Sequence, residues 1–432
     1  MRFDGNVRPV QRSVGVSGLG VVSVFGTSAD RFRDELLSGS TGIAPIKGFS
    51  LEGCRTTLAG EIAGFEPTAW MAPMKLRRLD RTGVYAVAAT KLAFADAGVQ
   101  ANPEGDDHTG VLFGTWTAGG QSTQQFLDAL FRSGPAAAPA LLFDSTVGNS
   151  AAGLTGLEFK LRGPNITVSH KEASGLGAVV GAVDLLRERR AQTVVAGGVD
   201  AVFETFFKAH DRFAVMSPES HFTHHVAPFD ANRRGFVIGE GAAVFRLECS
   251  PASSSPSSGS PSSGRHGRIL GVAASSAAVP VNAWPDRPEP LARTMRLALE
   301  DAGVPPADVG AVYASANATA LDEIEAQALK DVFDTGRAAS GGPVGPLVTS
   351  IKGAIGESGC AGSLSCAAAF LCGAVGKVPP IAGLGAPAPH AAGLRLATRV
   401  TDLPTRLVLV NSFASGGALF SVVLEVGTPP AS

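Results

Sequence analysis

The chain has 432 residues, of which 45% are hydrophobic, 17% are charged and 53 are glycine. This composition is typical of a globular protein with a large core and many close backbone contacts. The net charge of −2 gives no reason to expect binding to nucleic acid or to an anionic membrane.

The cysteines, histidines and glycines argue against several other classes of protein. Five cysteines without a C-x-x-C spacing disfavour disulfides and a zinc site, and favour a reducing cytoplasm. His221, His224 and His225 lack a zinc-type spacing, and we predict a surface loop there and no metal site. Gly18 and Gly20 lack the third glycine of a dinucleotide-binding motif, which predicts a tight turn and no cofactor.

Two segments were candidates for membrane targeting. Residues 1–10 are polar and lack the apolar stretch of a signal peptide. The uncharged run 358–376 is nearly long enough to span a bilayer, but it contains several Gly, Ser and Cys and has no flanking Trp or Tyr. We therefore predict a buried central helix there and no membrane partner.

Predicted strands and helices alternate along the chain. Hydrophobic patterns and turn residues predict strands at residues 14–23, 110–114, 166–168, 194–198, 243–247, 268–273, 309–314, 406–410 and 419–425. The same criteria predict helices at residues 30–37, 82–97, 121–131, 173–186, 291–302, 322–332 and 358–374. In the helix at 121–131 we expect the large apolar side chains to face inward.

The chain contains a weak internal repeat. Residues 172–198 and 359–383 each run from a small-residue helix through a basic turn to a buried strand with glycine at its end. This order predicts a layered α/β protein with two similar halves and helices between two sheets. The Ser-, Pro- and Gly-rich residues 250–267 predict a flexible loop, which leaves halves at 1–249 and 268–432.

Residues 163–175 are the stretch around which the chain is organised. A β-branched strand, Ile166 to Val168, turns sharply into a helix rich in glycine and alanine. A strand–turn–helix of this kind can lift one side chain into a buried site while the helix packs closely behind it. The residue at this apex is Glu172, and we call the turn the elbow.

Seven segments together resemble the β-ketoacyl synthases of fatty-acid and polyketide assembly, over nearly the whole chain. They are residues 14–22, 77–81, 163–165, 173–175, 228–230, 235–241 and 411–417. The resemblance implies a thiolase-like αβαβα fold with duplicated halves. It also implies a dimer whose sheets join across the interface.

In that family an elbow cysteine carries the acyl chain as a thioester, and two histidines decarboxylate the malonyl extender and stabilise the developing charge. Matched by residue, the cysteine position holds Glu172. The first histidine, expected eight residues before an aspartate, falls on Ala314 upstream of Asp322.

The second histidine position has two alternatives. Counted from Lys352 it falls on Glu357, and counted back from Gly359 it falls on Gly356. Ser415 stands where a phenylalanine usually gates the pocket. Because all three catalytic groups are absent together, the chain by itself is not expected to catalyse the family's Claisen condensation.

Among known members the chain is most like a chain length factor, the ketosynthase β subunit of type II polyketide synthases. That resemblance implies a heterodimer with an active ketosynthase α subunit, served by an acyl carrier protein. Candidates for the wall of the tunnel that limits the polyketide, or polyene, chain are Phe126, Leu130, Phe131 and Phe143. Taken singly, each is equally consistent with ordinary core packing.

A buried carboxylate at the elbow needs a cation, hydrogen-bond donors or its own proton. Candidate supports for Glu172 are Lys171, Ser174 and Arg234. Two other functions stay open. A decarboxylating, starter-generating ketosynthase would need the missing histidines, whereas a homodimeric acyl-binding pseudoenzyme would need no catalytic group.

Overall fold

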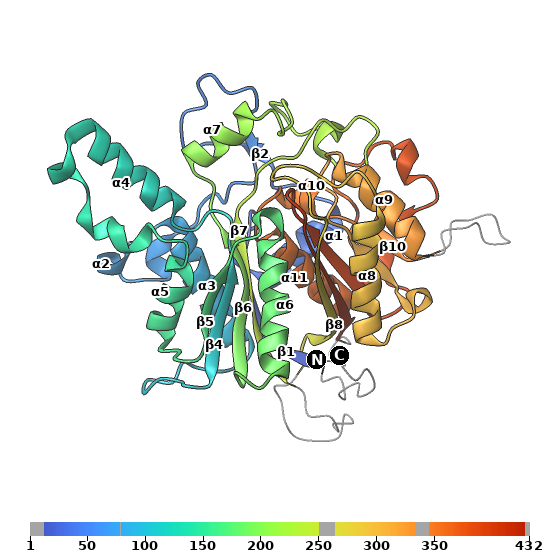
Figure 1. Ribbon diagram of the computed structural model, residues 1–432, viewed down its shortest axis with the longest axis horizontal. Coiled ribbons are helices and arrows are strands. Elements are labelled where there is room, and N and C mark those ends of the chain that lie inside the picture. The colour runs from blue at the N-terminus through green and yellow to red at the C-terminus, as the bar shows by residue number, and fades with distance from the viewer. Residues whose placement is uncertain (1–12, 78, 250–263, 334–344, 428–432) are drawn as a thin grey trace.

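The structure is a computed structural model, and it describes residues 13–77, 79–249, 264–333 and 345–427. One large sheet and the helices that cover it make up most of these residues (Figure 1). The predicted loop at 250–267 lies mostly outside the described residues. Its last residue, Gly267, already begins a strand of the sheet.

The main sheet has 11 strands in the order β12-β10-β9-β14-β15-β8-β1-β7-β6-β4-β5. In chain order these strands are β1 (Val14–Val22), β4 (Thr109–Gly114), β5 (Asn165–Val168), β6 (Thr193–Asp200), β7 (Gly241–Cys249), β8 (Gly267–Ser276), β9 (Ala311–Tyr313), β10 (Leu347–Thr349), β12 (Arg395–Leu396), β14 (Leu407–Phe413) and β15 (Ala418–Val426). Two short pairs, β2 (Ala44–Pro45) with β3 (Leu58–Ala59) and β11 (Lys377–Val378) with β13 (Thr401–Asp402), lie apart from it.

The strand pairing shows the duplication that the sequence predicted. In the N-terminal half, β1, β7 and β6 pair antiparallel, and β6, β4 and β5 pair parallel. In the C-terminal half, β8, β15 and β14 pair antiparallel, and β14, β9 and β10 pair parallel. The halves are joined by a short antiparallel contact in which Val14 lies opposite Ile269. Hydrogen bonding thus links the two expected sheets into one.

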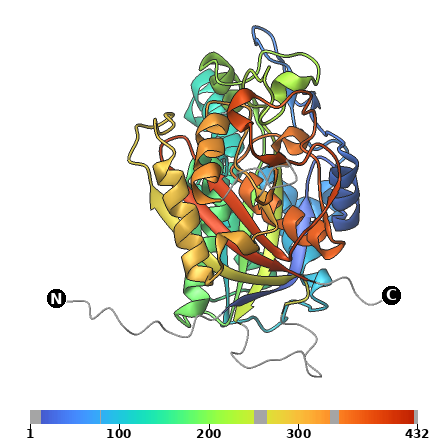
Figure 2. The same cartoon turned by 90° about the vertical axis from the view of Figure 1, so that its right-hand side faces the viewer.

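Some helices lie between the two halves, and others cover their outer faces. They are α1 (Ala29–Ser38), α2 (Pro73–Leu76), α3 (Arg81–Asp96), α4 (Gly120–Ser133), α5 (Ser150–Phe159), α6 (Ser174–Arg187), α7 (Glu204–Arg212), α8 (Glu289–Ala302), α9 (Leu321–Val332), α10 (Lys352–Ile355) and α11 (Ala361–Ala374). Helices α6 and α11 contact each other between the halves, whereas α3 and α8 cover outer faces. Figure 2 shows the gold helix α8 against the red strands β14 and β15.

Small side chains allow this close layering. A Cβ atom on Gly198 of β6 would lie 2.8 Å from the Cα of Gly175 in α6. A Cβ on Gly114 of β4 would lie 1.9 Å from the carbonyl oxygen of Ser174. Since real Cβ atoms do not approach backbone this closely, glycine at both positions fixes the distance between the sheet and the elbow helix.

The uncharged run at 358–376 contains the buried helix that we predicted, α11, and all but the last of its 14 residues are buried. In the part of the chain that the structure describes, no helix is both long and apolar enough to cross a bilayer.

Helix α4 contradicts the expectation of an inward apolar face. It projects from the body of the molecule (Figure 1), and Ser122 is its one buried residue. Phe131 is 81% exposed and Phe143, in the following segment, is 61% exposed. The interpretation of these side chains as ordinary core is therefore wrong for the single chain.

Candidate functional site

The elbow is built by β5, a single helical turn at Lys171–Ala173 and α6. Lys171 has a left-handed φ of 51°, which a non-glycine residue adopts only when its surroundings hold it there. The Ser174 hydroxyl accepts a hydrogen bond from His170 N (2.8 Å) and donates one to Lys171 O (2.6 Å). These bonds brace the turn on both sides of Glu172.

Glu172 is 3% exposed, and its carboxylate faces the hairpin loop between β14 and β15. Ser415 donates to it twice, from the backbone N–H to Oε2 (3.2 Å) and from the hydroxyl to Oε1 (2.8 Å). The Lys171 ammonium lies 3.8 Å from Oε1. Burial raises the pKa of Glu172 above its ordinary value, the charge of Lys171 opposes this shift, and the charge of Glu357 adds to it.

Lys171 connects the elbow to a third segment of the chain. Its ammonium donates to Asn282 Oδ1 (2.5 Å) and to the Ser415 hydroxyl, and it lies 5.4 Å from the centre of the Trp116 ring. The expected contact between Glu172 and Arg234 is not formed. Arg234 points instead toward Glu219, at 3.7 Å, because it lies on the outer wall of the neighbouring cavity.

Beneath the elbow lies a buried ion pair. Lys352 Nζ donates to Glu357 Oε2 (2.7 Å), and the two side chains are 3% and 0% exposed. Asn317 Nδ2 donates to the same oxygen at 2.7 Å, and Ser358 N donates to Oε1 at 3.1 Å. Three donors, the Lys352 ammonium, the Asn317 amide and the Ser358 N–H, thus meet this carboxylate, as a buried charge requires.

The two alternatives for the second histidine position, Gly356 and Glu357, have different surroundings. Gly356 has a φ of 80°, and a Cβ atom on it would lie 2.9 Å from the backbone of Gly239. It therefore has no room for a side chain toward the site. Glu357 supplies the group that lies near Glu172, which is why its charge raises the pKa of Glu172.

Ala314 does not belong to this polar cluster. Its side chain packs in an apolar cluster with residues of α8 and α9. The next residue, Ser315, points the other way, because side chains alternate along an extended segment. Its hydroxyl accepts from Phe413 N (2.9 Å) and lies 3.3 Å from Lys352 Nζ.

Two further buried carboxylates support the floor of the site. Asp322 accepts from the backbone N–H groups of Phe229, Asn317 and Ala318, and burial raises its pKa to about 6. Glu325 accepts from Ser315 N and from Asn411 Nδ2, each at 3.0 Å. Burial raises the pKa of Glu325 to about 7.

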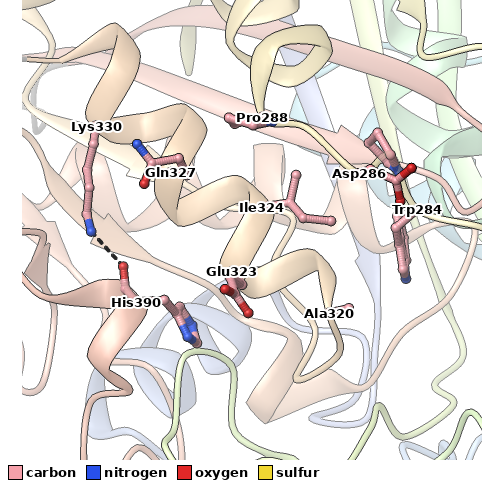
Figure 3. Close-up of a pocket in the computed structure, with 10 residues that line it drawn as sticks. Trp284, Asp286, Pro288, Ala320, Glu323, Ile324, Gln327, Lys330 and His390 are labelled. Atoms are coloured by element: carbon pink, nitrogen blue, oxygen red, sulfur yellow. Dashed lines mark hydrogen bonds between the residues drawn. The ribbon is translucent and has the colours of Figure 1, made fainter.

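A cavity of 760 Å³ opens in front of the elbow, and we call it the mouth cavity. Its lining includes Lys171, Glu172 and Ser415 of the elbow and the hairpin loop. It also includes Phe213 and Arg234. A second hollow of 690 Å³ lies beside it along α9 (Figure 3). The two hollows share Trp284, Ala320 and Glu323. Figure 3 shows the dashed bond from Lys330 to the backbone oxygen of His390 at the far end of the second hollow.

Comparison with known proteins identifies the family of this chain. The family model for the N-terminal domain of β-ketoacyl synthases matches residues 11–251, and the C-terminal domain model matches residues 266–384. The chain belongs to the β-ketoacyl synthase family. Its thiolase-like fold is the one that the sequence predicted.

Individual relatives support the same assignment. The tetracenomycin polyketide synthase ketoacyl synthase beta subunit of Streptomyces glaucescens is 32% identical over 87% of this chain and 88% of its own length. A granaticin polyketide putative beta-ketoacyl synthase of Streptomyces violaceoruber is 32% identical over 88% of this chain and 90% of its own. The solved ishigamide ketosynthase/chain length factor superposes with a TM-score of 0.86 at 27% identity, over 96% of this chain and all of the matched chain.

The chemistry of the site is set by the groups that contact its two buried glutamates. The groups that surround Glu172 and Glu357 in the contacts above are ammonium, amide, hydroxyl and backbone N–H groups. None of these is a thiolate nucleophile or an imidazole. Among the described residues, no group of three or more His, Cys, Asp and Glu side chains could hold a metal ion.

Three residues of this polar cluster were missed by sequence reasoning. Asn282 comes from the loop after β8, Ser315 and Asn317 come from the loop after β9, and each binds a residue of the elbow or of the ion pair. Their short polar side chains have no spacing that marks a site. One signal for the buried ion pair was available in the sequence. Lys352 lies five residues before Glu357, and at this spacing two opposite charges can meet across one turn.

Proposed function

We propose that this chain is a non-catalytic chain length factor that pairs with an active ketosynthase and helps to shape the tunnel for a growing polyketide, or polyene, chain on an acyl carrier protein. The observation that carries the proposal is Glu172, a carboxylate held by Ser415 and Lys171 at the apex where the family has its cysteine. We place the complex in the cytoplasm, since the cysteine usage fits a reducing compartment.

The chemistry of the site supports the absence of catalysis by this chain alone. Claisen condensation needs a nucleophile that is also a good leaving group, and it needs donors that meet the developing negative charge. A carboxylate at the elbow supplies neither, and Glu357 adds a second negative charge beside it. Lys352 is paired with Glu357, so its ammonium, which is bonded to Glu357 and Ser315, is not free to stabilise a developing oxyanion.

The exposed surfaces support pairing with a second subunit. Strand β5 is the last strand of the sheet, so its outer edge has no partner strand among the described residues. Close to that edge in the chain, α4, α5 and the segment between them expose large apolar side chains: Leu127, Phe131, Leu141, Phe143, Val147 and Leu157. Such a patch marks an interface on a protein of this size.

The named relatives support the kind of partner. One is described as a ketoacyl synthase beta subunit of a polyketide synthase, and a solved neighbour is described as a ketosynthase/chain length factor. The tunnel part of the proposal assigns Phe126, Leu130, Phe131 and Phe143 to a wall that is completed by the partner. Phe126 and Phe143 already contact each other, with ring centroids 5.7 Å apart.

Co-expression with an active ketosynthase tests the proposal. We expect size-exclusion chromatography to show a heterodimer, and we expect the chain alone to form no acyl-enzyme and to release no carbon dioxide from malonyl carrier protein. Carbon dioxide release by the chain alone would favour a decarboxylating, starter-generating function instead. A stable homodimer that ignores the ketosynthase would favour an acyl-binding pseudoenzyme.

The tunnel assignment has its own test. Phe126→Ala and Phe131→Ala variants of the complex are compared with the native complex by mass spectrometry of the products. If these rings limit chain length, at least one variant makes longer products, because the smaller side chain leaves more room in the tunnel. Unchanged product lengths in both variants would contradict the assignment.

A further inference from the structure

The hairpin loop between β14 and β15, residues 414–417, contains two glycines, which have wide conformational freedom, but hydrogen bonds to other segments hold it in place. Gly416 and Gly417 have left-handed φ values of 111° and 92°, which glycine adopts without strain. Between them and β14 lies Ser415, which is 7% exposed. We call residues 414–417 the glycine loop.

Two segments that are far from it in the sequence, the elbow and the segment after β8, hold the glycine loop. Glu172 of the elbow accepts both the N–H and the hydroxyl of Ser415. Lys171 donates to the same hydroxyl and to Asn282, which lies in the segment after β8. Gly416 N donates to Ala283 O (2.9 Å), which ties the glycine loop to that segment a second time.

These hydrogen bonds join residues that line the mouth cavity. Lys171, Glu172, Asn282 and Ser415 all belong to its lining. The buried Lys352–Glu357 pair lies near Glu172, since the charge of Glu357 acts on the Glu172 carboxyl. The glycine loop and the elbow are therefore fastened to each other across the inner end of the cavity.

We propose that Glu172, Lys171, Ser415 and Asn282 form a latch that keeps the glycine loop closed across the mouth cavity, so that an acyl chain cannot pass the elbow from this side. This inference rests on the proposed function, because a chain length factor must leave the acyl chain to its partner. It assigns a positioning role to Glu172, beyond the mere loss of a nucleophile.

The two departures from the family pattern at 172 and 415 complement each other. A serine in place of the gating phenylalanine leaves room for a carboxylate to reach the glycine loop and supplies a hydroxyl donor. A glutamate in place of the cysteine is long enough to meet that donor and the adjacent N–H. Each change without the other would leave a buried polar group unpaired, which is costly.

Hydrogen–deuterium exchange on the full chain tests the latch directly. In a Glu172→Ala variant the amides of Ser415 and Gly416 should exchange between about tenfold and a hundredfold faster, the factor expected when hydrogen bonds to a charged acceptor are lost. Ser415→Ala keeps the backbone bond, so about a threefold to tenfold increase is expected there. The matched control is Glu323→Gln, on the α9 side of the same cavity, which should leave this exchange unchanged.

A second measurement tests whether the latch closes the path. Octanoyl-pantetheine serves as the probe, and its binding to the native and variant chains is measured by calorimetry. We expect it to bind Glu172→Ala at least about tenfold more tightly than the native chain, because opening of the loop no longer opposes binding. Equal affinities with faster loop exchange would show that the loop does not close the path, and would overturn the proposal.

Unchanged exchange of the glycine loop in both Glu172→Ala and Ser415→Ala would also overturn it. If Glu172→Ala does not fold, Ser415→Ala and Lys171→Met carry the test, since they remove the hydroxyl and ammonium hydrogen bonds of the latch. Both measurements use the chain alone. A missing heterodimer in the co-expression experiment would therefore contradict the proposed function without affecting the evidence for the latch.

Discussion

The elbow and the projecting α4 region have opposite characters. At the elbow, polar groups are buried and satisfied by the chain itself, as the bonds from Ser415 and Lys171 to Glu172 show. In the α4 region, apolar side chains such as Phe131 and Leu157 are exposed and lack a cover among the described residues. The buried polar groups of the elbow are satisfied within the chain, whereas the exposed apolar side chains of the α4 region are the surface that we propose a partner covers. We expect this contrast in a subunit that joins a complex through the α4 region and whose own elbow is closed.

The largest effect is expected at the ion pair beneath the elbow. Lys352→Met removes the cation and leaves Glu357 buried without its charge partner, which should destabilise the fold by about 3–5 kcal/mol. The free energy of unfolding from urea denaturation measures this. The double variant Lys352→Met/Glu357→Gln should regain a large part of the loss, because the uncompensated charge is gone. If the free energy of unfolding of Lys352→Met differs from that of the native chain by less than about 1 kcal/mol, the pair is not structurally important.

The next effect is expected at the exposed patch. Phe131→Asp places a charge where we propose a desolvated interface, and should weaken the heterodimer by about 2 kcal/mol or more, which is roughly thirtyfold in Kd. Analytical ultracentrifugation of the complex measures it. Val375→Asp is the control, since this partly exposed residue follows α11, far along the chain from the patch. Equal weakening by both variants would place the interface elsewhere.

A smaller effect is expected in the pH dependence of the polar floor. The pKa of Glu325 is raised from 4.5 to about 7 by burial. The folded protein therefore holds this proton more tightly than the unfolded chain, so stability is full below pH 4.5 and falls as the pH rises toward about 7. Glu325→Gln should flatten this part of the stability curve. Denaturation midpoints at several pH values between these limits measure it, and an unchanged slope would contradict the assignment.

The smallest effect is expected within the α4 region itself. The Phe126 and Phe143 rings contact each other at 5.7 Å between centroids, and such a pair contributes about 0.5–1.5 kcal/mol beyond its area. A double-mutant cycle with Phe126→Leu and Phe143→Leu, measured by thermal unfolding, gives the coupling. A coupling near zero in the chain alone, but not in the heterodimer, would show that the partner orders this region.

Much of the fold could be predicted from the sequence because it depends on local patterns. The β-branched run before the elbow became β5, and the small residues that follow it became α6. The uncharged run of small residues became α11, at the corresponding position of the second half. The likeness of the two halves also followed from the weak repeat, whereas the order of the strands came from the structure.

The expected inward face of α4 was wrong for a physical reason. The helix has a clear apolar stripe, and such a stripe predicts that the face is covered but not by which chain. The same limit applied to Arg234, whose position in a motif did not reveal that Glu219 lay closer to it than Glu172. Contacts between distant segments depend on how the layers are stacked.

The sequence by itself determined most of the elements and the duplication, and it is the basis for the prediction that Glu172 and Glu357 stand at the family's reactive positions, because these follow from residue identity and order. Only the tertiary structure decided what these carboxylates do. It brought Ser415 to Glu172, Asn317 to Glu357 and Asn282 to Lys171 from separate loops, and it placed Ala314 in the apolar core. A buried charge is stabilised by the groups that surround it in space, and those groups are spread over more than two hundred residues of the chain.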